Sequence, residues 1–215
     1  AAVFSGTEEV RRLAKEHGVQ IAAFNAPGQT VVSGSAAGME RFCSMLLREG
    51  VAFKELSIGC AAHSALMEPA APLLRAAAEL LRFNSPAVPV FSSLSAEPMG
   101  SFDSDYLMQQ LCAPVHFHQA LHRAVEEGHR CFLEVGAAPV LAQAIEATAR
   151  EAGADIVQLS VHRLHEPERA VLECLGSLHS AGHSIGLGRL APVQEGPGHP
   201  LPSYPWRRKR LHFPF

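Results

Sequence analysis

The sequence lacks the features that would place it in a membrane, in an oxidising compartment or on nucleic acid. None of its apolar runs reaches membrane-spanning length, and no signal peptide is recognisable. Its five cysteines are odd in number, widely spaced and without a C-x-x-C pair, which favours reduced thiols over a disulfide framework. The net charge is −3, so no basic field indicates a nucleic-acid partner. These absences predict a cytoplasmic protein that binds neither membrane nor nucleic acid.

The first 58 residues alternate between strand-like and helix-like patterns. Apolar runs predict strands at residues 2–4, 19–24, 30–33 and 51–58. Between them, helices are expected to begin near Ser5 and Ser35 and to end at Gly18 and Gly50. The resulting β-α-β-β-α-β order is that of the ferredoxin-like fold, a four-stranded sheet with two helices on one face. The chain starts inside an apolar run and without methionine, so we expect it to belong to a longer protein.

The remainder of the chain has an α/β pattern. We expect helices at residues 65–83, 105–111, 115–127, 140–152 and 167–180, and strands at 89–92, 131–135 and 156–159. The strand at 131–135 is apolar enough to be buried, and strands that alternate with helices favour a parallel sheet. Beyond Gly182 the sequence is rich in glycine and proline and is typical of a linker.

Histidines at three nearby positions raise the question of a metal site. His118 and His122 would share one helix face, and His116 lies just before them. No carboxylate or cysteine completes a recognisable ligand set around them, so no metal is expected here.

Five blocks along the chain stand out in a fixed order. They are residues 21–34 (IAAFNAPGQTVVSG), 62–69 (AHSALMEP), 89–93 (PVFSS), 106–136 (with PVHF and FLEVG) and 201–206 (LPSYPW). Together they resemble the acyltransferase domains of modular type I polyketide synthases and, more distantly, malonyl-CoA:acyl-carrier-protein transacylases. The last block is similar to the linker that follows these domains in synthases.

The resemblance implies an architecture for the whole chain. Residues 1–58 would form a ferredoxin-like small subdomain, and residues 59–185 the C-terminal part of a larger α/β-hydrolase-like subdomain. Residues 186–215 would form the linker that follows the acyltransferase. The active site would lie in the groove between the two subdomains, and the nucleophile elbow would precede residue 1.

The resemblance also implies a chemistry and its partners. A serine takes the acyl group from acyl-CoA and passes it to the phosphopantetheine thiol of an acyl carrier protein. His63 stands where the family has its general base, and imidazole can accept and return a proton near neutrality. No cofactor is implied in this chain beyond the acyl-CoA substrate and the carrier's phosphopantetheine. Ketosynthase and linker domains of the same synthase, in a dimeric assembly, would be its neighbours.

Four residues ending at the histidine carry substrate specificity in this family. Malonyl-loading domains usually have His-Ala-Phe-His and methylmalonyl-loading ones Tyr-Ala-Ser-His, whereas this chain has Cys60-Ala61-Ala62-His63. Ala62 in place of phenylalanine removes a ring's volume, which favours an α-substituted or otherwise atypical acyl unit. Asn25 resembles the family asparagine that faces the groove. A turn-forming asparagine is the alternative, since Ala26 replaces the usual glycine.

The sequence contains a second serine motif near its C-terminal end. Residues 182–186 read G-H-S-I-G, but a nucleophile elbow needs a strand before its serine and a helix after it. Ser184 follows a predicted helix instead, so we do not expect it to be the nucleophile.

The alternative to a catalytic role for the chain is a non-catalytic scaffold that docks against the other domains of a synthase.

Overall fold

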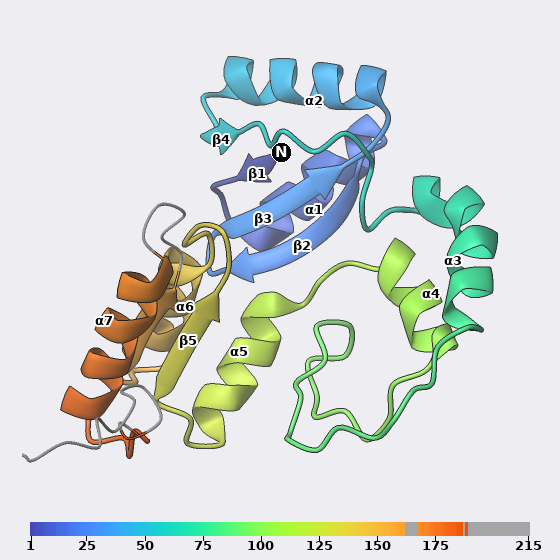
Figure 1. Cartoon of the computed structure of the whole chain (residues 1–215). Helices are drawn as coiled ribbons and strands as arrows, with labels where there is room; N and C mark the ends of the chain where they lie inside the picture. The colour runs from blue at the N-terminus through green and yellow to red at the C-terminus, as the bar shows by residue number, and fades with distance from the viewer. Residues whose placement is uncertain (162–166, 187, 189–215) are drawn as a thin grey trace, which may run out of the picture.

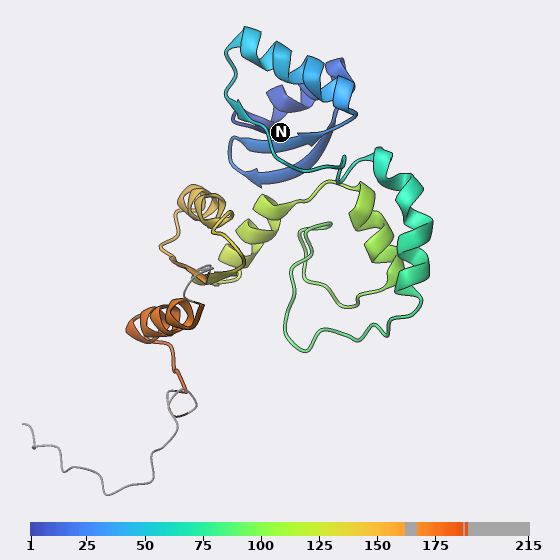
Figure 2. The ribbon, with the colours of Figure 1, turned by 45° about the horizontal axis from the view of Figure 1, so that its top comes forward.

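The computed structural model describes residues 1–161, 167–186 and 188. The chain folds into a compact first unit followed by two arms (Figure 2). One arm holds α3 and α4, and the other holds α5 to α7 with a small parallel sheet. The expected linker, with its LPSYPW block, lies outside the described residues. Within the described part of the chain, no helix is both long and apolar enough to cross a membrane.

The first unit has the expected order of strands and helices. Its elements are β1 (Ala2–Val3), α1 (Thr7–His17), β2 (Gln20–Ala26), β3 (Gln29–Ser33), α2 (Ala36–Glu49) and β4 (Phe53–Lys54). The strands form one antiparallel sheet in the order β2-β3-β1-β4, with α1 and α2 packed against it (Figure 1). The last strand is much shorter than the predicted 51–58, because it pairs only with the two residues of β1.

Both helices of this unit end where glycine permits a left-handed residue. Gly18 caps α1 with φ +66° and Gly50 caps α2 with φ +70°, a region that residues with a Cβ avoid. At the other end of α2, the Ser35 hydroxyl accepts a hydrogen bond from the backbone N–H of Gly38 at 3.2 Å, as expected of an N-cap.

One apolar core lies between the two helices and the sheet. It consists of buried residues from α1, α2 and three strand or turn positions: Val3, Val10, Leu13, Ala14, Val19, Val32, Phe42, Met45 and Leu46. Phe42 is its largest fully buried side chain. Because Val32 faces this core, its neighbours Val31 and Ser33 on β3 point to the opposite face of the sheet.

The helix expected at 65–83 is shorter and begins differently. A 3₁₀ turn, η1 (Ala65–Ala70), leads into α3 (Ala71–Ala78). Pro69 and Pro72 account for the start, because neither has the N–H that a regular helix requires, and Pro72 is tolerated only in the first turn of α3.

The strand expected at 89–92 is absent from this region. Phe91 makes a single isolated bridge with Pro98. Proline has no N–H to donate, so Pro89 and Pro98 prevent a longer ladder. The segment instead forms a turn closed by hydrogen bonds between residues 92 and 97 and between 90 and 99.

The second arm contacts the first unit along β2, and a backbone bridge joins the two there. Following α4 (Ser104–Cys112), Val115 pairs with β2 through two backbone hydrogen bonds, to Ala22 and from Phe24. The chain then enters α5 (Phe117–Glu126). This bridge joins residues 115 and 23, which are far apart in the sequence, immediately beside the loop that carries His63.

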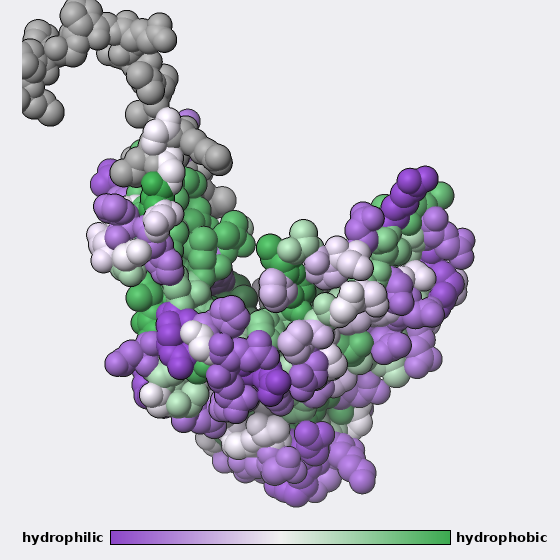
Figure 3. All heavy atoms as spheres, turned by 90° about the horizontal axis from the view of Figure 1, so that it is seen from below, coloured by the Kyte–Doolittle hydropathy of each residue, from purple (hydrophilic) through white to green (hydrophobic). Residues whose placement is uncertain are grey.

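A two-stranded parallel sheet completes the second arm. The sheet consists of β5 (Cys131–Val135) and β6 (Val157–Val161). The chain connects them through α6 (Ala142–Glu151) and continues into α7 (Pro167–Ser180). The prediction of a buried β5 is wrong, because Leu133 is 44% exposed and Val135 77% exposed. A parallel strand is buried when it has neighbours on both edges and both faces, and among the described residues only β6 pairs with β5. Hydrophobic surface accordingly borders the hollow between the α7 side and the α3 side (Figure 3).

Candidate active site

His63 lies in the loop between β4 and η1 and has an unusual backbone. Its φ is +57°, in the left-handed region that non-glycine residues seldom occupy. Hydrogen bonds on either side fix the loop. Ser33 on β3 donates to the carbonyl of Ala62 at 2.8 Å, and the Gln20 side chain accepts from the backbone N–H of Ala65 at 2.8 Å. Held strain of this kind is found where a side chain must be aimed.

Ser64 has a different role from the helix cap that its position suggests. It is fully buried, and its hydroxyl donates to the carbonyl of Ala61 at 2.6 Å. The hydroxyl therefore closes the loop around His63 and makes no side-chain cap on η1.

The imidazole of His63 is oriented by a backbone carbonyl. Its Nδ1 lies 2.9 Å from the carbonyl oxygen of Gln110 on α4. A carbonyl can only accept, so in the neutral imidazole Nδ1 carries the hydrogen and Nε2 has the lone pair. Within residues 1–161, 167–186 and 188, that Nε2 has no hydrogen-bond partner. This is the arrangement of a histidine that can take up a proton at Nε2.

Pro114 explains why the Gln110 carbonyl is available. In a continuing helix that oxygen would accept from the N–H of residue 114, but proline has none. Proline also disfavours the helical conformation in the residue before it, and Ala113 is extended, with ψ 152°. The last intrahelical bond runs from Ala113 to Gln109, at 2.9 Å. The carbonyl of Gln110 therefore has no partner within the helix and accepts a hydrogen bond from His63 instead.

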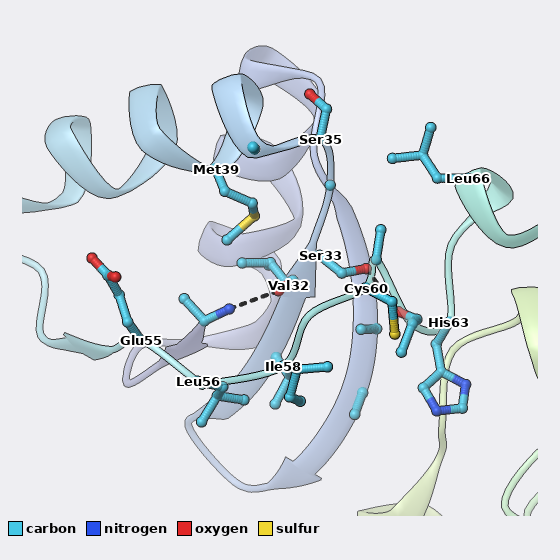
Figure 4. Close-up of a pocket in the computed structure, with 18 of the residues that line it drawn as sticks. Val32, Ser33, Ser35, Met39, Glu55, Leu56, Ile58, Cys60, His63 and Leu66 are labelled. Atoms are coloured by element: carbon cyan, nitrogen blue, oxygen red, sulfur yellow. Dashed lines mark hydrogen bonds between the residues drawn. The ribbon is translucent and has the colours of Figure 1, made fainter.

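The site residues expected from the sequence meet at one groove of about 870 Å³. Asn25 on β2 and the whole stretch Cys60, Ala61, Ala62 and His63 line it. The groove continues between β3 and residues 55–58 toward Met39 on α2, and the His63 ring points away from that far end (Figure 4). Asn25 is therefore a groove residue as well as a neighbour of the turn.

Gln110 is the part of the site that sequence reasoning missed. It contributes a backbone carbonyl oxygen, which every residue type has, so the identity of the residue gives no indication of this role. The one signal was a proline four positions after a residue in the last turn of a predicted helix.

Ser184 does not lie in a nucleophile elbow. It comes four residues after the end of α7, beyond a turn in which Gly182 has φ +91°. A helix rather than a strand precedes it, in agreement with the sequence-based rejection.

The three histidines near α5 have different polar or stacking partners, although the rings of His118 and His122 also lie edge-on to each other, with centroids 6.2 Å apart. His118 lies between the buried hydroxyl of Thr148 on α6, 2.9 Å from Nδ1, and the Glu151 carboxylate, 3.1 Å from Nε2. His122 lies 3.7 Å from Glu126, and the His116 ring stacks on Phe24. Among the described residues, no group of three or more histidine, cysteine or acidic side chains is arranged to hold a metal ion.

The stability of this region is expected to decrease below about pH 6.5. Burial lowers the pKa of His118 from its usual 6.5, with Glu151 opposing the shift and His122 adding to it. The unfolded chain then binds a proton that the folded chain does not, so the free energy of unfolding falls as the pH drops toward the folded-state pKa. Urea unfolding between pH 7 and 5 should show a smaller pH dependence in His118→Gln. His179→Gln, at an exposed histidine on α7, should keep the native dependence. Equal slopes in the two variants would contradict this assignment.

Comparison with known proteins gives one consistent family. A model described as "Acyl transferase domain" matches residues 1–186. The 5-methyl-1-naphthoate synthase of Streptomyces sahachiroi is 34% identical over 81% of this chain and 10% of its own length. Erythronolide synthase EryA2 of Saccharopolyspora erythraea is 32% identical over 90% of this chain and 5% of its own.

A solved structure agrees with these relatives. The acyltransferase domain from the second module of the salinomycin polyketide synthase superposes with a TM-score of 0.82 at 30% identity. The match covers 93% of this chain and 48% of the solved one, so the chain spans about half the length of that domain. It spans a tenth or less of the two synthases. The chain belongs to the acyltransferase domain family of polyketide synthases.

Proposed function

We propose that this chain supplies the base-bearing half of an acyltransferase site. In the complete protein, the site moves an acyl group from CoA to the phosphopantetheine thiol of an acyl carrier protein. The observation that carries the proposal is the geometry of His63, a groove residue whose Nδ1 is bonded to the Gln110 carbonyl and whose Nε2 has no partner among the described residues.

The chemistry follows from that free nitrogen. A serine hydroxyl attacks the thioester carbonyl while Nε2 of His63 takes its proton. The imidazolium returns the proton to the departing CoA thiolate, which leaves an acyl-serine. In the second half, Nε2 takes the proton of the carrier's phosphopantetheine thiol as that sulfur attacks the ester. The proton then passes to the serine oxygen.

The serine itself is assigned to a part of the protein outside this sequence. The nearby hydroxyls of Ser33 and Ser64 are bonded to loop carbonyls and not to Nε2. Ser184 lacks the strand that an elbow needs. We therefore expect the nucleophile on a strand–turn–helix elbow that precedes residue 1.

The division into subdomains belongs to the same proposal. Residues 1–58 would be the ferredoxin-like small subdomain, in keeping with the strand order β2-β3-β1-β4 and two helices on one face. Residues 59–185 would belong to the α/β-hydrolase-like large subdomain, and 186–215 to the linker. Ketosynthase and carrier domains of a dimeric synthase would be the partners.

Acyl loading tests the proposal directly. The full protein that contains this chain is incubated with malonyl-CoA or methylmalonyl-CoA, and its intact mass is measured. We expect a covalent acyl adduct on a serine outside residues 1–215, which disappears when carrier protein is added. A mass that stays unchanged with these two and with longer and monocarboxylic acyl-CoAs would favour the scaffold role instead.

The substitution Ala62→Phe is expected to shift substrate preference toward malonyl-CoA. Ala62 lines the groove next to His63, and a phenyl ring there would occupy space that an α-substituent of the acyl group needs. One methylene is typically worth about 1–3 kcal/mol of discrimination, or roughly 10- to 200-fold in kcat/KM. Competition between malonyl-CoA and methylmalonyl-CoA measures the shift, with Ala77→Phe, at an exposed alanine of α3 that does not line the groove, as the control. A native protein that already prefers malonyl-CoA would contradict the steric argument.

A further inference from the structure

Ser93 lies where the two segments that flank Pro114 come together. Its hydroxyl accepts a hydrogen bond from Nε2 of the Gln110 side chain at 3.1 Å and is 3.4 Å from Oε1 of the same amide. Its backbone carbonyl accepts from the N–H of His116 at 2.6 Å. One residue is thus bonded to the last turn of α4, before the proline, and to the start of α5, after it.

The turn that carries Ser93 is itself attached to α4. The neighbouring Ser92 is 2% exposed, and its hydroxyl accepts from the backbone N–H groups of Leu94 and Ser95 at 3.0 and 3.2 Å. The same hydroxyl lies 3.0 Å from the phenol oxygen of Tyr106 on α4. The turn and the helix that offers its carbonyl to His63 therefore form one hydrogen-bonded assembly.

We propose that Ser93 is a positioning residue for His63 and acts through Gln110. The Gln110 carbonyl has no helical partner, because Pro114 lacks an N–H, so the final turn of α4 does not by itself fix the direction of that oxygen. The bond from the Gln110 amide to Ser93 immobilises the residue that bears the carbonyl. The bond from His116 to the Ser93 carbonyl holds the chain on the other side of the proline. This inference rests on the proposed function of His63.

Substitutions at both ends of the side-chain bond test the role. In the full protein, Ser93→Ala is expected to lower kcat for transfer of the malonyl or methylmalonyl group to carrier protein about tenfold. That is the upper end of what one neutral hydrogen bond supports. KM for the acyl-CoA should not change, because Ser93 does not line the groove. Ser93→Thr, which keeps the hydroxyl, should recover most of kcat. Gln110→Leu, which keeps the carbonyl and loses the amide, should reproduce the loss.

Ser95→Ala is the matched control, since Ser95 is an exposed serine of the same turn. Within the described residues its hydroxyl makes one long bond, 3.4 Å from the backbone N–H of Glu97. The Ser95→Ala variant should keep native kcat. A native kcat in both Ser93→Ala and Gln110→Leu would overturn the inference, as would a rise in KM with kcat unchanged.

A double variant separates this inference from the proposed function. If Ser93 acts through His63, then adding Ser93→Ala to a protein that already carries His63→Asn should cause no further loss of kcat. An additional tenfold loss there would show a general structural effect and overturn the positioning role. Native activity in His63→Asn alone would overturn the proposed function itself, whereas a loss in His63→Asn with native activity in Ser93→Ala would overturn only the role of Ser93.

Discussion

Replacing His63 with asparagine is expected to slow acyl transfer about 10³-fold, within the range that a general base contributes. Asparagine suits the position because it tolerates the left-handed backbone better than other residues, and His63 has φ +57°. Its amide can still donate to the Gln110 carbonyl, but it cannot take up a proton. Fold and groove should therefore persist while the chemical step is lost. The measurement is the rate of acyl-enzyme formation in single turnovers, monitored through the release of CoA.

An exposed histidine provides the comparison for that result. His179→Asn, on the surface of α7, should leave the rate of acyl-enzyme formation unchanged. A His63→Asn protein that loads acyl groups within tenfold of the native rate would show that another group serves as the base.

Phe42→Ala is expected to reduce the free energy of unfolding by about 3–5 kcal/mol, the range for removing a buried phenylalanine. Phe42 is fully buried between α2, α1 and the sheet. Its ring packs edge-on against that of His17, with the two ring centroids 6.1 Å apart. The same sheet presents Asn25 and Ser33 to the groove, so unfolding of this unit would also remove one wall of the site.

Leu47 on the same helix serves as the control for this loss. Its side chain is 71% exposed, so Leu47→Ala should change the free energy of unfolding by about 0.5 kcal/mol or less. Urea unfolding followed by circular dichroism compares the two variants. A loss below about 1 kcal/mol in Phe42→Ala would contradict the packing described for this core.

The first unit could be predicted well from sequence because its signals are local. Glycines at 18 and 50 end the two helices, Ser35 begins the second one, and short apolar runs separate them. The final strand was overestimated, since its length depends on β1, which offers only two residues for pairing. A strand's extent is set by its neighbour as much as by its own composition.

The errors in the second part of the chain have other causes. Prolines at 69 and 72 delayed the helix, and prolines at 89 and 98 prevented a strand, although both segments are apolar enough for the predicted elements. The exposure of β5 could not be predicted from sequence. An apolar strand pattern indicates that a strand should be buried by neighbours, but it does not identify the strands and helices that would cover it.

The candidate site divides in the same way. Side chains that line the groove, from Cys60 to His63 and at Asn25, could be identified because their types and order resemble a known pattern. The orienting partner of His63 could not, since it is an oxygen common to every residue. The orphan carbonyl was predictable in principle from the proline at 114, but its use by a histidine 47 positions earlier in the chain depends on the tertiary fold.

An alanine scan across α4 would leave in place the carbonyl oxygen that orients the histidine. Alanine at position 110 keeps the carbonyl and removes only the amide that reaches Ser93. A loss of activity in Gln110→Ala would therefore report the bond to Ser93, and no side-chain substitution at this position removes the carbonyl itself. The role of the carbonyl could be tested by replacing the amide between residues 110 and 111 with an ester, which makes the carbonyl oxygen a weaker hydrogen-bond acceptor. In such a protein we expect the acyl-transfer rate to fall although every side chain is native.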